Sequence, residues 1–199
     1  MTKETTLRKI FLDELKDVYH AEKQLVKALP KLAKASTSPD LRTALEEHLG
    51  ETETQVERLE KVFEMLGETA KAKVCPGMQG IIEEGSELLK EEDKGPVLDA
   101  GIIAGAQRAE HYEMAAYGTL IAWAEALGMD DVISLLNENL EEEKAADEKL
   151  SEIAEDGINA AAAAGQEDSE ETEDEEETVG AGAGSNRARP PAKSKASRR

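Results

Sequence analysis

The sequence predicts an all-α protein, a bundle of four long helices, and three observations support this fold class. Aromatic residues make up only 3% of the 199 residues, and runs of β-branched residues that would form strands are absent from the sequence. Apolar residues recur at intervals of three and four over long segments, as on one face of a helix. The connections between these segments are short, long and short in chain order.

The predicted helices have recognisable ends. The four long helices are expected at about residues 5–35, 39–66, 97–127 and 130–155. Ser38 is a typical N-cap for the second helix, with Pro39 at its first position, and Gly67 ends it. The long connection, residues 68–95, carries a short helix at residues 78–89. Two helical hairpins joined by one long crossover form the ferritin-like four-helix topology.

Composition divides the chain into a helical bundle at residues 1–159 and a disordered tail at residues 160–199. Nine acidic residues lie between positions 166 and 178 of the tail, and six basic residues follow. The net charge of −20 argues against a nucleic-acid-binding bundle, because phosphate would be repelled. The basic end of the tail is the one segment that keeps contact with nucleic acid open as a hypothesis.

We expect a cytoplasmic protein without a membrane partner. Cys75 is the only cysteine, so an intramolecular disulfide is excluded. No apolar run is long enough to span a bilayer, and the first ten residues lack the apolar stretch of a signal peptide.

Each long helix has an apolar stripe that should face the interior, which we call its seam. Polar residues, nearly all of them charged, interrupt the seam of every long helix near its middle. In the segment AEHYE, residues 109–113, two glutamates lie on the same stripe as Ala106, Tyr117 and Leu120. The residues that interrupt the seams are Glu22, His48, Glu51, Glu110, Glu113, Glu143 and Asp147. Because the middles of antiparallel helices meet at one level of a bundle, we expect these seven side chains to converge.

The six carboxylates and one imidazole of this set cannot share a dry core unless cations or protons neutralise them. Two divalent metal ions would do so, and a carboxylate-rich site with one imidazole suits iron or manganese. Two alternatives stay open: a single glutamate on a seam is often solvated, and buried carboxyl groups can be neutralised by protons.

Four long phrases resemble the bacterial YciE/YciF family: FLDELKDVYHAEKQLVKALPKLA, LEEHLGETETQVERLEKVFE, AQRAEHYEMAAYGTL and LEEEKAADEKL. The resemblance covers about residues 5–155 and includes the central CPGMQGIIEEG segment. It implies a ferritin-like bundle with a di-iron centre, ferroxidase activity, a role in the stress response and a homodimer. It also carries all seven seam residues over as metal ligands, because each occupies a matching motif position.

One departure from the common ferritin-like pattern concerns the histidines. That pattern has Glu-x-x-His on two helices. Here the second helix has the reverse order, His48-x-x-Glu51, and the fourth has Glu143 and Asp147 without a histidine. One imidazole therefore serves two metal ions, and the identity of the metal stays open between iron and manganese.

Two functions are predicted. The first is a di-iron carboxylate protein with two ions per chain that oxidises Fe(II) with oxygen or peroxide in stress protection. Manganese in the same site would instead indicate peroxide disproportionation. The alternative is a non-catalytic stress protein with a structural metal or none, acting as a binding scaffold.

Overall fold

The structure, a computed structural model, describes residues 6–164, and within this range it contains helices and no strand. The elements are α1 (Leu7–Ala35), α2 (Pro39–Met65), α3 (Pro76–Glu91), α4 (Pro96–Ala126) and α5 (Asp130–Ile153), followed by one π-helical turn at Ala154–Ile158. The prediction of an all-helical protein is therefore confirmed.

Local chemistry sets the helix ends. Thr6 and Ser38 cap α1 and α2, each accepting a hydrogen bond from the backbone N–H three residues later, at 3.2 and 3.3 Å. Gly67 and Gly128 follow α2 and α4 with φ of +70° and +65°, a conformation that favours glycine. The cap at Ser38 and the stop at Gly67 agree with the sequence prediction.

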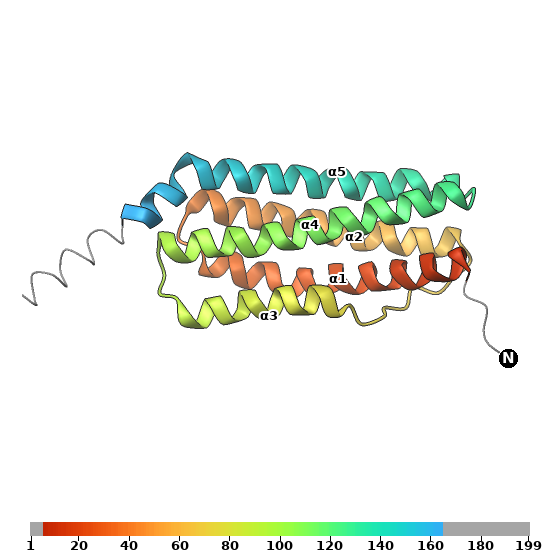
Figure 1. Cartoon of the computed structure of the whole chain (residues 1–199), viewed down its shortest axis with the longest axis horizontal. Coiled ribbons are helices and arrows are strands. Elements are labelled where there is room, and N and C mark those ends of the chain that lie inside the picture. Colours follow the sequence, from red (N-terminus) through yellow and green to blue (C-terminus); the bar gives the residue numbers. More distant parts are fainter. Residues whose placement is uncertain (1–5, 165–199) are drawn as a thin grey trace, which may run out of the picture. The chain divides into compact units, whose positions relative to one another are not determined.

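The four long helices contact one another in a closed ring, in the order α1, α2, α5, α4 (Figure 1). Helices α1 and α2 run in opposite directions, as do α4 and α5. The short helix α3 belongs to the long connection between α2 and α4, and it lies against α1 and α4. Two antiparallel hairpins thus face each other, and α3 covers one of the seams between them.

The interior consists of two apolar clusters. One contains Phe11, Leu15, Leu59 and Leu136, and the other contains Leu25 among its core residues. Buried polar residues separate them near the middle of each long helix. A layer of buried polar residues, most of them glutamates, therefore lies between two apolar parts of the interior.

Within the described residues, no helix has the length and hydropathy that a membrane span requires. Residues 159–164 continue as helix beyond the π-helical turn. The rest of the predicted tail lies outside the described residues, so its disorder stays a prediction.

Candidate metal centre

Five of the seven predicted ligands lie together in the interior, and we call them the polar layer: Glu22 of α1, His48 of α2, Glu110 and Glu113 of α4, and Glu143 of α5. None is more than 6% exposed. Each occupies the seam of its helix, one or two turns from apolar residues that anchor the same face. All four long helices therefore contribute to one site.

His48 forms one half of the polar layer with Glu110 and Glu143. Its Nε2 atom lies 3.4 Å from Glu110 Oε2 and 3.7 Å from Glu143 Oε2. One potential ligand atom from each of the three residues lies within 4.8 Å of the others. The Nδ1 atom lies 3.3 Å from Glu51 Oε2, and when it carries the proton it donates to that carboxylate. Nε2 then carries a free lone pair, as a metal-binding imidazole does, and lies beside the two glutamates.

Glu22 and Glu113 form the other half, beside Tyr117. The Tyr117 hydroxyl donates a short hydrogen bond to Glu22 Oε1 and accepts one from Asn139 Nδ2 at 2.9 Å. Burial raises the pKa of Tyr117 well above its usual value, and the nearby glutamate charges raise it further. The hydroxyl therefore keeps its proton and stabilises the charged form of Glu22.

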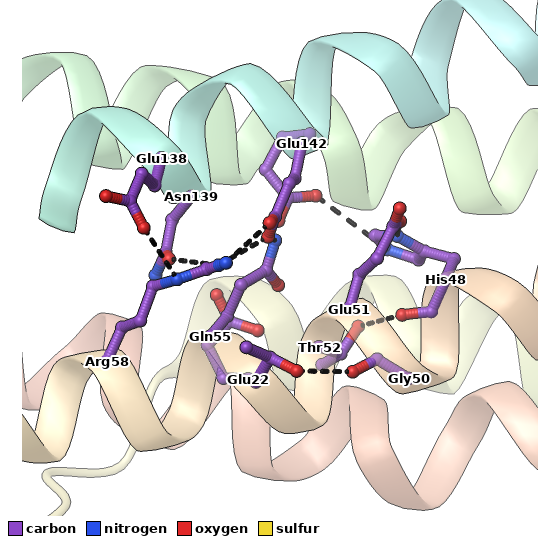
Figure 2. A network of polar contacts seen from close by, with 12 residues as sticks. Glu22, His48, Gly50, Glu51, Thr52, Gln55, Arg58, Glu138, Asn139 and Glu142 are labelled. Atoms are coloured by element: carbon purple, nitrogen blue, oxygen red, sulfur yellow. Dashed lines mark hydrogen bonds and ion pairs between the residues drawn. The ribbon is translucent and has the colours of Figure 1, made fainter.

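An arginine on α2 fixes the orientation of Asn139 (Figure 2). Arg58 binds both carboxylate oxygens of Glu142 at 2.6 and 2.7 Å, and its Nε atom lies 3.2 Å from Glu138. Arg58 also donates to Asn139 Oδ1 at 3.1 Å. Because the amide oxygen faces Arg58, the amide nitrogen faces Tyr117. A chain of hydrogen bonds thus connects a half-buried arginine to the buried Glu22.

Most carboxylate oxygens of the polar layer lack a hydrogen-bond donor. Among the described residues, both oxygens of Glu113 and Glu143 and one oxygen each of Glu22 and Glu110 are buried without a donor. Burial raises the pKa of Glu22, Glu110 and Glu113 well above the usual value, and the neighbouring carboxylates raise it further. Native proteins leave few buried polar atoms unsatisfied, so this cluster calls for a cation or for protons.

The donor set fits iron or manganese. It offers carboxylate oxygens and one imidazole nitrogen, without thiolate or thioether, and such ligands suit these metals. The buried carboxylate oxygens without a hydrogen-bond donor belong to the four glutamates of the polar layer. A bound cation would therefore satisfy atoms that the protein itself leaves unsatisfied.

Glu51 and Asp147 lie at the edge of the polar layer. The side chain of Glu51 is 46% exposed and contacts His48. The side chain of Asp147 is 23% exposed; it accepts from Gln107 Nε2 at 3.2 Å and lies 3.3 Å from His111 Nε2. Glu51 follows His48 by three residues and is turned about 60° away around the helix axis, while Asp147 lies one turn beyond Glu143. The structure thus does not bring these two into the interior.

The sequence interpretation missed Asn139 and Arg58. Asn139 is buried on α5, only 1% exposed, whereas the neighbouring apolar residue Leu140 is half-buried. The spacing of three from Leu136 and four to Glu143 could have identified Asn139. No sequence signal identifies Arg58, because its partners lie on a helix about 80 residues away.

A cavity of about 190 Å³ between α2 and α5 leads from the surface to the polar layer. His48 and Glu110 lie at its inner end, and Glu47, Glu51 and Lys149 line its outer part. A hydrated cation could reach His48 and Glu110 through this opening.

The comparisons with known proteins agree with the resemblance seen in the sequence. Residues 6–163 match the family described as Domain of unknown function (DUF892). Protein YciF of Escherichia coli (strain K12) is 45% identical over 155 residues, which cover 77% of this chain and 93% of YciF.

Three solved structures share the fold. The crystal structure of the E. coli stress protein YciF has a TM-score of 0.75 and 44% identity, covering 78% of this chain and 99% of YciF. YcfI of Rhodopseudomonas palustris, named as a proposed structural protein, has a TM-score of 0.73 and 48% identity, covering 76% and 97%. A protein from Xanthomonas campestris pv. campestris, at 21% identity and a TM-score of 0.63 over 81% and 99%, shares the fold alone.

Proposed function

We propose a function from two premises: the chain belongs to the DUF892 family as a relative of YciF, and it buries four glutamates and a histidine in one layer. The protein is a ferritin-like four-helix bundle, with α3 in its long crossover, that binds two iron ions per chain and oxidises Fe(II). The observation that carries this proposal is the set of six carboxylate oxygens buried without a hydrogen-bond donor.

Each half of the polar layer holds one ion. His48 and Glu110 belong to the first ion, and Glu22 and Glu113 to the second. Glu143 lies 3.7 Å from His48 in the first half, and its charge raises the pKa of Glu22 in the second as well as that of Glu110, so we assign it to both ions. Glu51 orients the His48 ring, and Asp147 completes the outer edge of the site. Each Fe(II) bound there would give up one electron to the oxidant, and hard carboxylate ligands would favour the ferric product.

The residues around the layer prepare it for a cation. Tyr117 donates to Glu22, which favours the charged carboxylate, and Asn139 and Arg58 hold the tyrosine in that orientation. The apolar clusters on both sides exclude water and fix the helices. A site on four rigid helices keeps its ligands in place between binding events.

A second candidate function is a non-catalytic scaffold in which protons replace the metal. The raised pKa values of Glu22, Glu110 and Glu113 support it, because neutral carboxyl groups can occupy a dry core. In this protein the bundle would act through its surface. Homodimer formation, cytoplasmic location and manganese as the metal remain predictions under either function.

The test measures metal content and Fe(II) oxidation on the full-length chain. Elemental analysis by mass spectrometry and anaerobic Fe(II) titration compare the wild type with a double variant, Glu110→Ala with Glu143→Ala. The matched control is Glu125→Ala with Glu141→Ala, which removes exposed glutamates from the same two helices.

Under the proposal, the wild type and the control bind two Fe(II) per chain and oxidise them faster than Fe(II) is oxidised free in solution. The double variant binds no Fe(II), and its circular dichroism still shows folded helices. Metal uptake without oxidation would support a structural metal. No uptake by the wild type would support the proton-neutralised scaffold.

A further inference from the structure

A second cavity reaches the polar layer from the opposite side of the helix ring. It lies between α1, α3 and α4 and has a volume of about 50 Å³. Apart from Lys31, Ser86 and Glu110, every side chain that lines it is apolar or a glycine. Glu110 lines both this cavity and the cavity between α2 and α5. One carboxylate of the proposed centre is therefore reached by two routes.

The two routes differ in chemistry. The opening between α2 and α5 carries the carboxylates of Glu47 and Glu51, which suit a hydrated cation, beside Lys149. The cavity under α3 offers few polar partners, because Ser86 donates its hydroxyl to the Ile82 carbonyl at 2.8 Å and Lys31 is exposed. Small apolar cavities stay free of water and admit apolar gases. Hydrogen peroxide would lose its hydrogen bonds to water there, whereas dioxygen has none to lose.

Glycines on α4 determine the space under α3. A Cβ atom on Gly101 would approach Leu88 Cδ2 to 2.7 Å, so α3 lies as close to α4 as a glycine permits. One turn later, a Cβ atom on Gly105 would meet no atom within 4 Å, although Gly105 lines the cavity. Gly85 of α3 is also free of such contacts. Because glycine is unfavourable inside a helix, its use at Gly105 points to the open space it leaves.

We infer that the cavity between α1, α3 and α4 is the path by which dioxygen reaches Glu110, while cations reach the same layer between α2 and α5. This inference rests on the proposed function and makes dioxygen, not peroxide, its oxidant. Two Fe(II) ions give up one electron each, and one O2 takes both electrons with two protons from solvent and leaves as hydrogen peroxide. Helix α3 then serves to enclose the gas path.

Gly105→Leu tests the path, because a leucine there would fill the cavity without meeting a neighbour at its Cβ. The matched control is Gly118→Leu on the same helix. Gly118 also has no atom within 4 Å of a Cβ, and it does not line the cavity. The separation of thirteen positions along the helix places the control about 20 Å away along the axis.

The first readout is structural and independent of activity. Crystals of each full-length protein are pressurised with xenon, which binds in apolar cavities. Xenon is expected beside Ile82 and Gly105 in the wild type and in Gly118→Leu, and it should be absent from Gly105→Leu. A wild type without xenon at this position would overturn the inference.

The second readout is stopped-flow oxidation of protein loaded anaerobically with Fe(II), mixed with either dissolved O2 or hydrogen peroxide. Gly105→Leu should slow the O2 reaction about tenfold, a barrier increase of about 1.4 kcal/mol, and leave the peroxide reaction unchanged. Equal slowing of both reactions, or slowing of neither, would overturn the inference while iron binding stands. If the wild type binds no Fe(II), the proposed function fails, and the inference fails with it.

Discussion

The structure buries carboxylates in two regions, and it treats them in opposite ways. Asp99, in the first turn of α4, is 2% exposed and accepts from the backbone N–H groups of Thr37 and Ser38, both at 2.8 Å, and from the Thr37 hydroxyl at 2.5 Å. The glutamates of the polar layer are buried as deeply, but six of their oxygens accept no hydrogen bond.

This difference separates a structural carboxylate from a candidate ligand. Asp99 ties the α1–α2 turn to the start of α4, and its donors come from the protein itself. The polar layer consists of four carboxylates and a single imidazole. Its negative charge must therefore be balanced by metal ions or protons, which come from the solvent. Burial alone does not distinguish the two regions; the supply of donors does.

The largest expected effect is on Asp99. Asp99→Ala would leave two backbone N–H groups and a hydroxyl without their acceptor, and we expect it to lower the free energy of unfolding by about 3–5 kcal/mol. Urea denaturation of the metal-free protein measures this change, with the exposed Asp40→Ala as a control that should cost less than about 0.5 kcal/mol. A cost below about 1 kcal/mol would show that the three hydrogen bonds are not structural.

Metal should stabilise the protein through the polar layer alone. Anaerobic Fe(II) at a hundredfold excess over its Kd is expected to raise the free energy of unfolding by about 2.7 kcal/mol for each occupied site, or about 5.4 kcal/mol for two ions per chain, and a chelator should reverse the gain. Asp99→Ala should keep this increment, and Glu110→Ala with Glu143→Ala should lose it. An increment that survives in the double variant would assign the binding to other residues.

Replacing a glutamate of the polar layer should raise the free energy of unfolding, whereas replacing Asp99 should lower it. Glu113→Gln retains the shape of a side chain whose two oxygens lack donors, and we expect it to stabilise the metal-free protein by about 1 kcal/mol near pH 7. Urea denaturation in the presence of chelator tests this, with the exposed Glu53→Gln as a neutral control. A loss of stability would place Glu113 with Asp99 as a structural carboxylate.

The smallest expected effect is a pH dependence of the metal-free protein. Burial raises the folded-state pKa of Glu22, Glu110 and Glu113, so their contribution to stability is complete below the unfolded pKa and is lost as pH rises through the folded one. The melting temperature of the metal-free protein should therefore rise as the pH is lowered from about 8 to about 5. The slope should be smaller in a Glu110→Gln, Glu113→Gln double variant; an equal slope would assign it to surface charge.

Local features of the fold could be predicted because they depend on neighbouring residues. Ser38, Pro39 and Gly67 mark helix ends through their own backbone and side-chain chemistry, and the structure has them in these roles. The polar layer could be predicted in part, because glutamates on an apolar seam must meet the seams of the other helices. Whether these residues bind metal stays a prediction.

Other features depend on contacts that no local pattern contains. Glu51 and Asp147 are rotated around the helix axis by only a fraction of a turn from the buried ligands. The three- and four-residue spacing of apolar residues does not resolve such a small rotation. Asn139 differs in another way, since an apolar residue is the ordinary expectation at a buried position of a helix. The fit of α3 depends on Gly101 meeting Leu88, a contact between two helices whose separation the sequence does not specify.

The polar layer draws on residues from Glu22 to Glu143, and this order has a consequence during synthesis. At about 5–20 residues per second, the ribosome adds the last of these glutamates roughly 6–24 s after the first. Until α5 has emerged, the earlier carboxylates have no complete interior to enter and remain hydrated. Their dehydration therefore coincides with the docking of the last helix, so the nascent chain meets its least favourable electrostatic step when nearly all of its apolar surface is available to drive it.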